Sequence, residues 1–408
     1  MKNQQPFFSG LSVATEILVS CAIFCLPIAK AATEVTIIAA MVCWILYKII
    51  AKIPLLPASK AVIFYSLLLG IILLSLIQAP PFLVPEGLRG VLKWLKYLGI
   101  FFMCWDIYRE PKKQTRLFLV FLASMLVVSL DGFYQLHTGI DLLRKQTLDP
   151  GRIVRMKACL GAPNLLASFL LFAMPLSVSL FVRSRAWLRA LWGTAFFVFA
   201  TAFFLTYSRG AFYAMALSLL LNLFALKRIK FALIAIGCLT VLIFTVPSLR
   251  YNFVETIERK DITIAERGDY WKVAFNMIKQ HPILGVGVNT YHSKFPSYAP
   301  DPTVRQAYPH NSYLQMASEI GLPGLFVFIL ALGYAFRRSF KLSLAAETGM
   351  IPLRIALFAF LLQGFFDNNL YALQAAYLFW GTWGVFHACI FRVAADTQIK
   401  KNNPPNLC

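Results

Sequence analysis

A histidine at the start of an apolar helix carries the clearest chemical signal in this sequence. His310 stands in AYPHNSYLQMASEIGLPG, residues 307–324, just before a run that reads as a helix. A helix dipole disfavours positive charge at that position, which favours a neutral imidazole able to accept a proton. The same helix end would present free N–H groups to an anion. A neutral base beside an anion site suits transfer of a group away from a phosphate leaving group, although the stretch also fits a plain helix start.

An acid lies deeper in the same predicted helix. Residues 312–315 have the pattern of a capping box, which predicts that the helix begins at Ser312. Glu319 then lies on the order of 10 Å further along the helix. An acid at that depth needs a partner or a proton, and we expect Arg209 to be the partner. Gly321 permits a close neighbour, and Pro323 favours a kink because it cannot donate to the carbonyl of Glu319.

Two arginines occupy positions where a charge needs an explanation. Arg209, in TYSRGA, joins two apolar spans and can either pair or extend its head to the membrane surface. A second capping box, residues 263–266, predicts a helix from Ile264 to His281-Pro282. One apolar stripe of this helix comprises Arg267, Trp271, Ala274 and Ile278. Arg267 therefore either has an anionic partner or lays its stem along the stripe with its head in water.

A glycine-containing segment, ILGVGVNTY at residues 283–291, follows that helix. Gly285 and Gly287 permit a tight backbone path and close approach of a ligand. The signal is weak as a phosphate-binding loop. Asn289 and Tyr291 end the segment and are kept as candidate contacts to substrate.

Membrane-spanning helices must position these residues. The chain is 59% hydrophobic and 14% charged, whereas soluble domains carry roughly 25% charged residues. Strand-like alternation is absent, which argues against a membrane barrel. We therefore predict an all-α polytopic membrane protein with about twelve transmembrane helices. The expected spans lie near 11–29, 32–50, 60–79, 92–108, 115–136, 163–182, 187–207, 211–226, 229–247, 312–336, 351–370 and 371–391.

Basic residues orient these spans. Every second connection is rich in Lys and Arg, which places those connections and both termini in the cytoplasm. Two connections on the outer side break the rule. The short one, 137–162, favours an anionic ligand such as a phosphate or pyrophosphate. Its basic residues are Arg144, Lys145, Arg152, Arg155 and Lys157. The other connection, 248–311, is the single long loop, and its basic residues also fit a solvated surface.

Other ligand classes lack a signal. The net charge of +21 follows from orientation signals and the two outer loops, and needs no nucleic acid. The eight cysteines form no CxxC pair, so a zinc site is not supported. Nothing has the pattern of a Walker loop, which disfavours a nucleotide site.

Several motifs resemble one family. His310-Asn311, nine residues, Gly321, two residues and Gly324 is similar to the histidine motif of the O-antigen ligase and polymerase superfamily. Three other segments agree: GAPNLLA (161–167), TYSRGA (206–211) and RGDYWKVAFNMIKQHPILGVGVNTY (267–291). The resemblance covers roughly residues 130–330.

The resemblance implies a GT-C-like glycosyltransferase with one long helical periplasmic loop. Such enzymes work at the periplasmic face of the bacterial inner membrane. They move a glycan from undecaprenyl pyrophosphate to an acceptor hydroxyl, with no metal or nucleotide cofactor. In ligases the acceptor is the lipid A–core of lipopolysaccharide, and this is the function we favour. By motif position, His310 corresponds to the essential histidine, and Arg209 and Arg267 to the arginines that engage pyrophosphate.

Other predicted substrate-binding residues surround these three. They are Asn311, Glu319, Asn164, Arg152, Arg155, Lys157, Asn289 and Tyr291. The predicted regions are residues 1–136 with spans one to five, a catalytic region 137–336 that includes the loop 248–311, and residues 337–408 with the last two spans and a cytoplasmic tail.

Three alternatives stay open. A polysaccharide polymerase, with a growing glycan as acceptor, fits the same loops and motif. An O-linked protein glycosyltransferase is less favoured, because the sequence lacks a large soluble domain. A transporter of lipid-linked glycans is also less favoured, because it would carry charges along the midplane of many spans.

Overall fold

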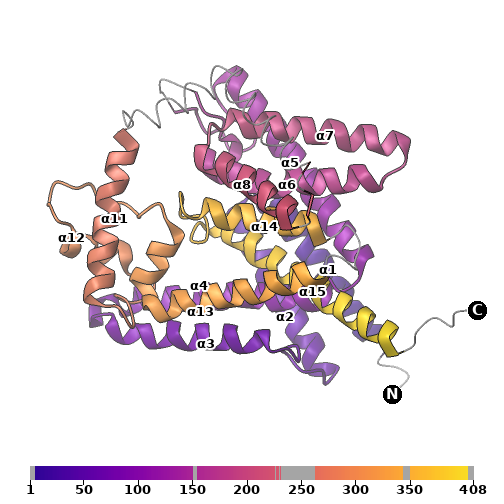
Figure 1. Ribbon diagram of the computed structural model, residues 1–408, viewed down its shortest axis with the longest axis horizontal. Coiled ribbons are helices and arrows are strands. Elements are labelled where there is room, and N and C mark those ends of the chain that lie inside the picture. Colours follow the sequence, from indigo (N-terminus) through magenta and orange to yellow (C-terminus); the bar gives the residue numbers. More distant parts are fainter. Residues whose placement is uncertain are drawn as a thin grey trace, which may run out of the picture.

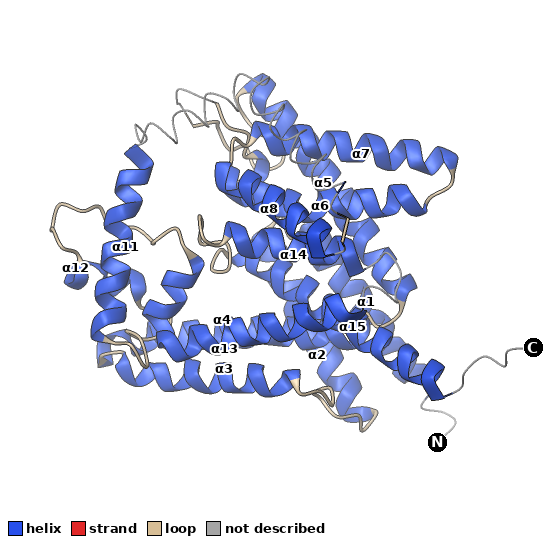
Figure 2. Ribbon diagram, viewed as in Figure 1, coloured by secondary structure: helices blue, strands red, loops and turns tan. Residues whose placement is uncertain are grey.

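The structure is a computed structural model that describes residues 5–149, 154–225, 227, 228, 230, 262–342 and 350–402 (Figure 1). Over these residues it contains thirteen α-helices and no β-strand (Figure 2). The α-helices are α1 (Gln5–Cys25), α2 (Lys30–Ile50), α3 (Ala61–Ser75), α4 (Val84–Ile107), α5 (Pro111–Thr138), α6 (Pro163–Arg183), α7 (Ala186–Leu205), α8 (Arg209–Ala225), α11 (Ile262–Gln280), α12 (Tyr291–Tyr298), α13 (Ser312–Leu342), α14 (Met350–Gln363) and α15 (Leu373–Asn402). Short 3-10 helices are η2 (Leu76–Gln78), η3 (Pro81–Leu83) and η4 (Ala158–Leu160).

Length and composition make this a multi-pass membrane protein. Among the described residues, seven helices are long and apolar enough to cross a membrane: α2, α3 with η2, α5, α6, α7, α13 and α15. Shorter apolar helices are Gly10–Cys25, α8 and α14. Large apolar side chains such as Val35 and Phe197 are 68% and 70% exposed, as expected of helices that face lipid. The predicted ninth span, 229–247, lies outside the described residues.

The two ends of the bundle differ. The C-terminal end of α15 lies at one end, and α11 and α12 lie at the other (Figure 1). We call the end with α11 and α12 the loop end. Helix α13 packs against α3, and α4 packs against α15, so these helices connect the two ends. Helix α8 packs against α14, and α6 against α7.

The last two predicted spans require a correction. Helix α14 ends at Gln363 and α15 begins at Leu373, so residues 364–372 form a connection rather than parts of two abutting spans. Polar side chains hold this connection against α13. Ser312 Oγ donates to the carbonyl oxygen of Asp367 at 3.0 Å and to Asn369 Oδ1 at 3.1 Å. These tertiary bonds offset the loss of helical hydrogen bonds, which the apolar pattern alone does not reveal.

Helix α13 is kinked where the sequence predicts it. Gly321 has φ 75° and ψ 173°, a conformation that essentially only glycine adopts. A Cβ atom there would lie 2.1 Å from the carbonyl oxygen of Ile283. The carbonyls of Ser318 and Glu319, which lose their helical donors at the kink, accept instead from the N–H groups of Val286 and Gly287 at 2.7 and 3.1 Å. The segment 283–291 is thereby fixed against α13.

Candidate active site

Three arginines from separate elements converge at the loop end; we call Arg155, Arg209 and Arg267 the arginine cluster. Arg155 precedes α6, Arg209 is the first residue of α8, and Arg267 lies near the start of α11. Arg155 is fixed by two bonds: Nε donates to the carbonyl oxygen of Thr206 at 2.9 Å, and Nη2 donates to Asn164 Oδ1 at 2.9 Å. The first bond ties the segment before α6 to the turn that leads into α8.

Arg155 lies within Coulombic range of both other arginines of the cluster. Burial lowers the pKa of Arg155, the positive charges of Arg209 and Arg267 lower it further, and the negative charge of Asp367 opposes them. Two cations and one acid therefore lie within Coulombic range of Arg155. Arg209 also begins a helix, where the dipole disfavours a cation. Such a concentration of positive charge is suited to a polyanionic ligand.

His310 joins this cluster through Asp367. The imidazole Nδ1 lies 3.5 Å from Asp367 Oδ1, longer than a normal hydrogen bond. Nδ1 is buried, whereas the side chain as a whole is 41% exposed. The backbone of His310 has φ 46°, and the preceding carbonyl of Pro309 accepts from Trp271 Nε1 at 2.8 Å. Helix α11 and the connection 364–372 together hold the imidazole at the start of α13.

The start of α13 corrects one prediction. The helix begins at Ser312 as expected, but Asn311 is the cap: its Oδ1 accepts from the N–H groups of Tyr313 and Leu314, both at 3.0 Å. The N–H of Ser312 donates to the carbonyl of Gly364 at 2.7 Å. The first N–H groups of this helix are therefore used within the protein. They are not free for an anion, so the cations must supply that role.

The predicted partner of Glu319 is also wrong. Glu319 is 2% exposed. Its Oε2 accepts from the N–H of Asn289 at 2.9 Å, and its Oε1 accepts from Gln315 Nε2 at 3.0 Å. The charged group in Coulombic range is Lys93 of α4, whose Nζ donates to the carbonyl oxygen of Tyr371 at 2.9 Å. The Glu319 carboxylate does not pair with Arg209. It interacts with the 283–291 segment and with Lys93 of α4, and so helps to hold both against α13.

The buried face of α11 is displaced from the predicted stripe. The helix starts at Ile262, so residues 263–266 lie within it and do not cap it; its C-terminal end matches the prediction. The buried positions are Tyr270, Val273, Ala274 and Met277. This face packs on Tyr291 and Phe295 of α12, an element that the sequence analysis did not predict. Arg267 and Trp271 are only partly buried.

The remaining predicted residues fall into separate groups. Asn164 binds Arg155 and belongs to the cluster. Lys157 is 6% exposed and pairs with Asp149 at 2.7 Å between Nζ and Oδ1. Tyr291 is fully buried, and its hydroxyl donates to the carbonyl oxygen of Tyr270 at 3.3 Å. Tyr291 therefore packs the loop and offers no surface to a ligand. Arg152 lies outside the described residues.

Asp367 is the site residue that the sequence analysis missed. It was visible as one of three polar residues that interrupt a long apolar run. An ionisable residue in such a run is a functional candidate by default. The sequence does not show that its partner is His310, because His310 lies at the start of another helix and only the folded chain brings the two together.

The geometry combines a histidine, an acid that faces it, and a cluster of arginines. Residues 194–329 match the family model described as O-antigen ligase. This stretch, a third of the chain, is similar to O-antigen ligases. This match confirms the resemblance to that superfamily and supports glycan transfer of O-antigen ligase or polymerase type. It includes Arg209, Arg267 and His310, whereas Arg155, Asn164 and Asp367 lie outside it. No curated protein matches the chain.

Proposed function

We propose that this protein moves a glycan from undecaprenyl pyrophosphate to an acceptor hydroxyl at the loop end. The observation that carries the proposal is that Arg155 lies within Coulombic range of Arg209, of Arg267 and of Asp367, the acid that faces His310. A pyrophosphate is the polyanion released when such a donor loses its sugar. The arginine cluster offers several bidentate donors to that group without a metal ion.

His310 acts as the general base in this proposal. Its buried Nδ1 faces Asp367, which leaves Nε2 for the acceptor hydroxyl. As the acceptor oxygen forms a bond with the anomeric carbon, the bond from that carbon to the pyrophosphate oxygen breaks. The hydroxyl proton passes to Nε2, and the pyrophosphate retains the bonding electrons. Catalytic contacts that are long in a resting site tighten in the reacting complex, so Asp367 would then orient the imidazole and stabilise its cation.

The arginine cluster stabilises the leaving group. Negative charge builds on the pyrophosphate oxygens as the glycosidic bond breaks, and preorganised cations lower the energy of that state. Asn164 fixes the Arg155 guanidinium by accepting from Nη2. The cluster thereby supplies the charge that a metal ion supplies in other phosphate chemistry, so we expect transfer without a metal or nucleotide.

The proposed location is the bacterial inner membrane, with the loop end at the periplasmic face. The basic residues Arg337, Arg338 and Lys341 lie at the far end of α13 from His310. A helix of 31 residues is on the order of 45 Å long, enough to separate the two faces. The lysines and arginines mark the cytoplasmic face, and His310 is then on the opposite one.

Among acceptors we favour the lipid A–core of lipopolysaccharide. A polymerase that extends a growing glycan is the alternative, and an O-linked protein glycosyltransferase is less favoured. A transporter is disfavoured because the arginine cluster lies at one end of the bundle rather than along a path through it. The test uses purified protein in proteoliposomes with an undecaprenyl pyrophosphate-linked glycan.

Three acceptors are offered in parallel: lipid A–core, a second molecule of the lipid-linked glycan, and a serine-containing peptide. Glycan appearing on lipid A–core supports ligation. Lengthened lipid-linked glycan identifies a polymerase instead. If none of the three acceptors receives glycan from the donor, the proposed transfer is contradicted.

A further inference from the structure

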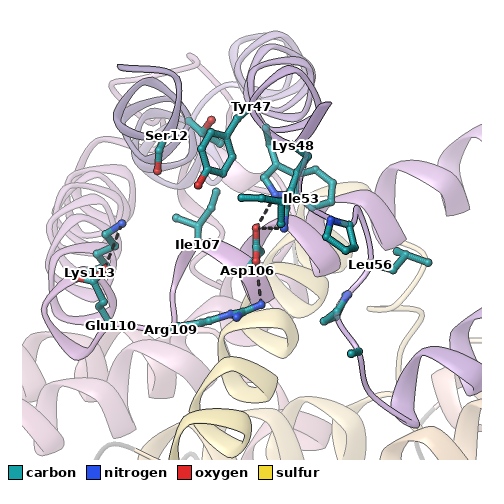
Figure 3. A pocket seen from close by; sticks show the side chains of 15 residues that line it. Ser12, Tyr47, Lys48, Ile53, Leu56, Asp106, Ile107, Arg109, Glu110 and Lys113 are labelled. Carbon is teal, nitrogen blue, oxygen red and sulfur yellow. Dashed lines mark hydrogen bonds and ion pairs between the residues drawn. The ribbon is translucent and has the colours of Figure 1, made fainter. Parts of the chain in front are cut away.

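A second polar cavity lies at the other end of the bundle. It has a volume of about 500 Å³ and is bounded by α1, α2, α4, α5 and the connection 51–60 (Figure 3). Helix α4 links it to the loop end: Gly90 packs on Asn289, whereas Asp106 lines the cavity. Sixteen residues of helix separate these positions, roughly 24 Å at the usual rise. The cavity is therefore distinct from the arginine cluster.

A buried ion pair forms the floor of this cavity. Lys48 is 5% exposed, and its Nζ lies 2.7 Å from Asp106 Oδ2. Asp106 also accepts from Arg109 Nη2 at 2.9 Å and from Trp44 Nε1 at 3.2 Å. Figure 3 shows Lys48 and Arg109 approaching Asp106 from opposite sides. Asp106 thus holds the two cations in fixed positions, but its single charge balances only one of them.

Lys113 adds a cation whose two ion pairs are long. Its Nζ lies 3.6 Å from Glu16 Oε2 and 3.7 Å from Glu110 Oε1, beyond normal hydrogen-bond lengths. The Nε–H of Arg109 is buried without an acceptor. The charged residues that line the cavity are Lys48, Arg109, Lys113, Asp106 and Glu110. Together with Glu16 and its other partner Arg116, they comprise four cations and three acids, which leaves an excess of one positive charge. The cavity therefore favours an anion that accepts from Lys113 and Arg109.

The rim of the cavity is apolar. Ile53, Pro54 and Leu56 line it, and Ile53 and Leu56 are each 41% exposed. The helices beneath carry lipid-facing residues such as Ile49, which is 66% exposed. A ligand in this position therefore contacts cations with one part and the hydrocarbon layer with another. Basic pockets between transmembrane helices at the cytoplasmic side bind anionic lipid headgroups in this manner.

We propose that this cavity binds the phosphate of an anionic phospholipid, with Lys113 and Arg109 as its donors and the acyl chains along the apolar rim. Lys48 and Asp106 are the positioning pair that holds Arg109. The predicted orientation assigns this lipid to the cytoplasmic leaflet. This site is independent of glycan transfer, because it involves neither the donor nor the arginine cluster.

Native mass spectrometry of the full-length protein in detergent tests the proposal with short-chain phosphatidylglycerol as the probe. Phosphatidylcholine of the same chain length and inorganic phosphate are the comparison ligands. Lys113→Gln should weaken phosphatidylglycerol binding roughly tenfold, the value of a lost charge-assisted hydrogen bond. Lys112→Gln is the matched control, because Lys112 is the exposed neighbour, carries the same charge and does not line the cavity.

Arg109→Gln is the second variant, and Lys113→Gln alone carries the test if Arg109→Gln does not fold. The proposal is supported if phosphatidylglycerol binds in preference to phosphatidylcholine and only the Lys113 and Arg109 variants lose it. The proposal is wrong if Lys113→Gln binds phosphatidylglycerol as tightly as Lys112→Gln does. It is also wrong if the two lipids bind equally, or if an equal concentration of inorganic phosphate displaces phosphatidylglycerol, which would identify a site for free phosphate.

Discussion

The imidazole of His310 and the carboxylate of Asp367 face each other at 3.5 Å between Nδ1 and Oδ1. His310 precedes α13, and Asp367 lies in the connection between α14 and α15. The same connection is bonded to α13 through Ser312 Oγ. The pair is thus held by the packing of two elements that are distant in sequence, and it lies beside the arginine cluster.

Asp367→Asn should lower glycan transfer by roughly 10- to 1000-fold, a part of what a general base contributes. The amide keeps the shape of the side chain but cannot stabilise the imidazole cation. The measurement is the initial rate of transfer across a range of pH, together with the unfolding temperature. Asp301→Asn, at an exposed position between α12 and α13, is the control. If both variants transfer at the wild-type rate, Asp367 does not position the base.

Arg209→Lys and Arg267→Lys should each impair transfer when lipid donor is limiting. Lysine keeps the charge but loses the bidentate geometry, so we expect about a tenfold loss or more for each. Rates are measured at several donor concentrations, since a contact to pyrophosphate affects both donor binding and the departure of the leaving group. Arg305→Lys is the control, because Arg305 is exposed in the same loop. Full activity of both variants at limiting donor would rule out a shared pyrophosphate site.

Gly321→Ala should destabilise the protein, because the kink of α13 needs a backbone conformation that alanine disfavours by about 1–3 kcal/mol. The added Cβ would also meet the carbonyl oxygen of Ile283. Gly333→Ala in the same helix is the control, since a Cβ there has no atom within 4 Å. The unfolding temperature in detergent should fall for Gly321→Ala alone. An unchanged value would show that the kink can relax.

The loop end should lie outside the cytoplasm. Ser297 is exposed on α12, so Ser297→Cys, in a chain without its native cysteines, should react with a membrane-impermeant maleimide. The label is added to cells permeabilised only at any outer membrane. Lys52→Cys, in the connection at the opposite end, should stay unlabelled until the inner membrane is broken. The reverse pattern would place His310 on the wrong side for the proposed transfer.

The kink at Gly321 was the most predictable feature, since proline and glycine act through their own backbone. His310 was singled out by its place before a predicted helix. For Arg209 and Arg267 the sequence left two interpretations open, and the resemblance to a family selected them. The rule on basic loops predicts that all three lie on one side of the membrane.

Partners were less predictable, because they come from other elements. Glu319 bonds to Asn289 and Gln315 instead of Arg209. Asn311 replaces the predicted cap of α13, because Ser312 is engaged by the connection 364–372. The buried face of α11 is set by its packing on α12, a helix that the sequence does not strongly predict. In each case tertiary packing selects among several local arrangements that the sequence permits.

The most direct test of the account is the rate of glycan transfer by purified His310→Ala in proteoliposomes that contain the lipid-linked donor and its acceptor. The unfolding temperature and the amount of protein inserted in the membrane are measured in the same preparation. We predict a loss of roughly 10²–10⁴-fold, the usual contribution of a general base, with insertion and unfolding temperature unchanged. Transfer near the wild-type rate would contradict the account and leave His310 as a residue of the helix start.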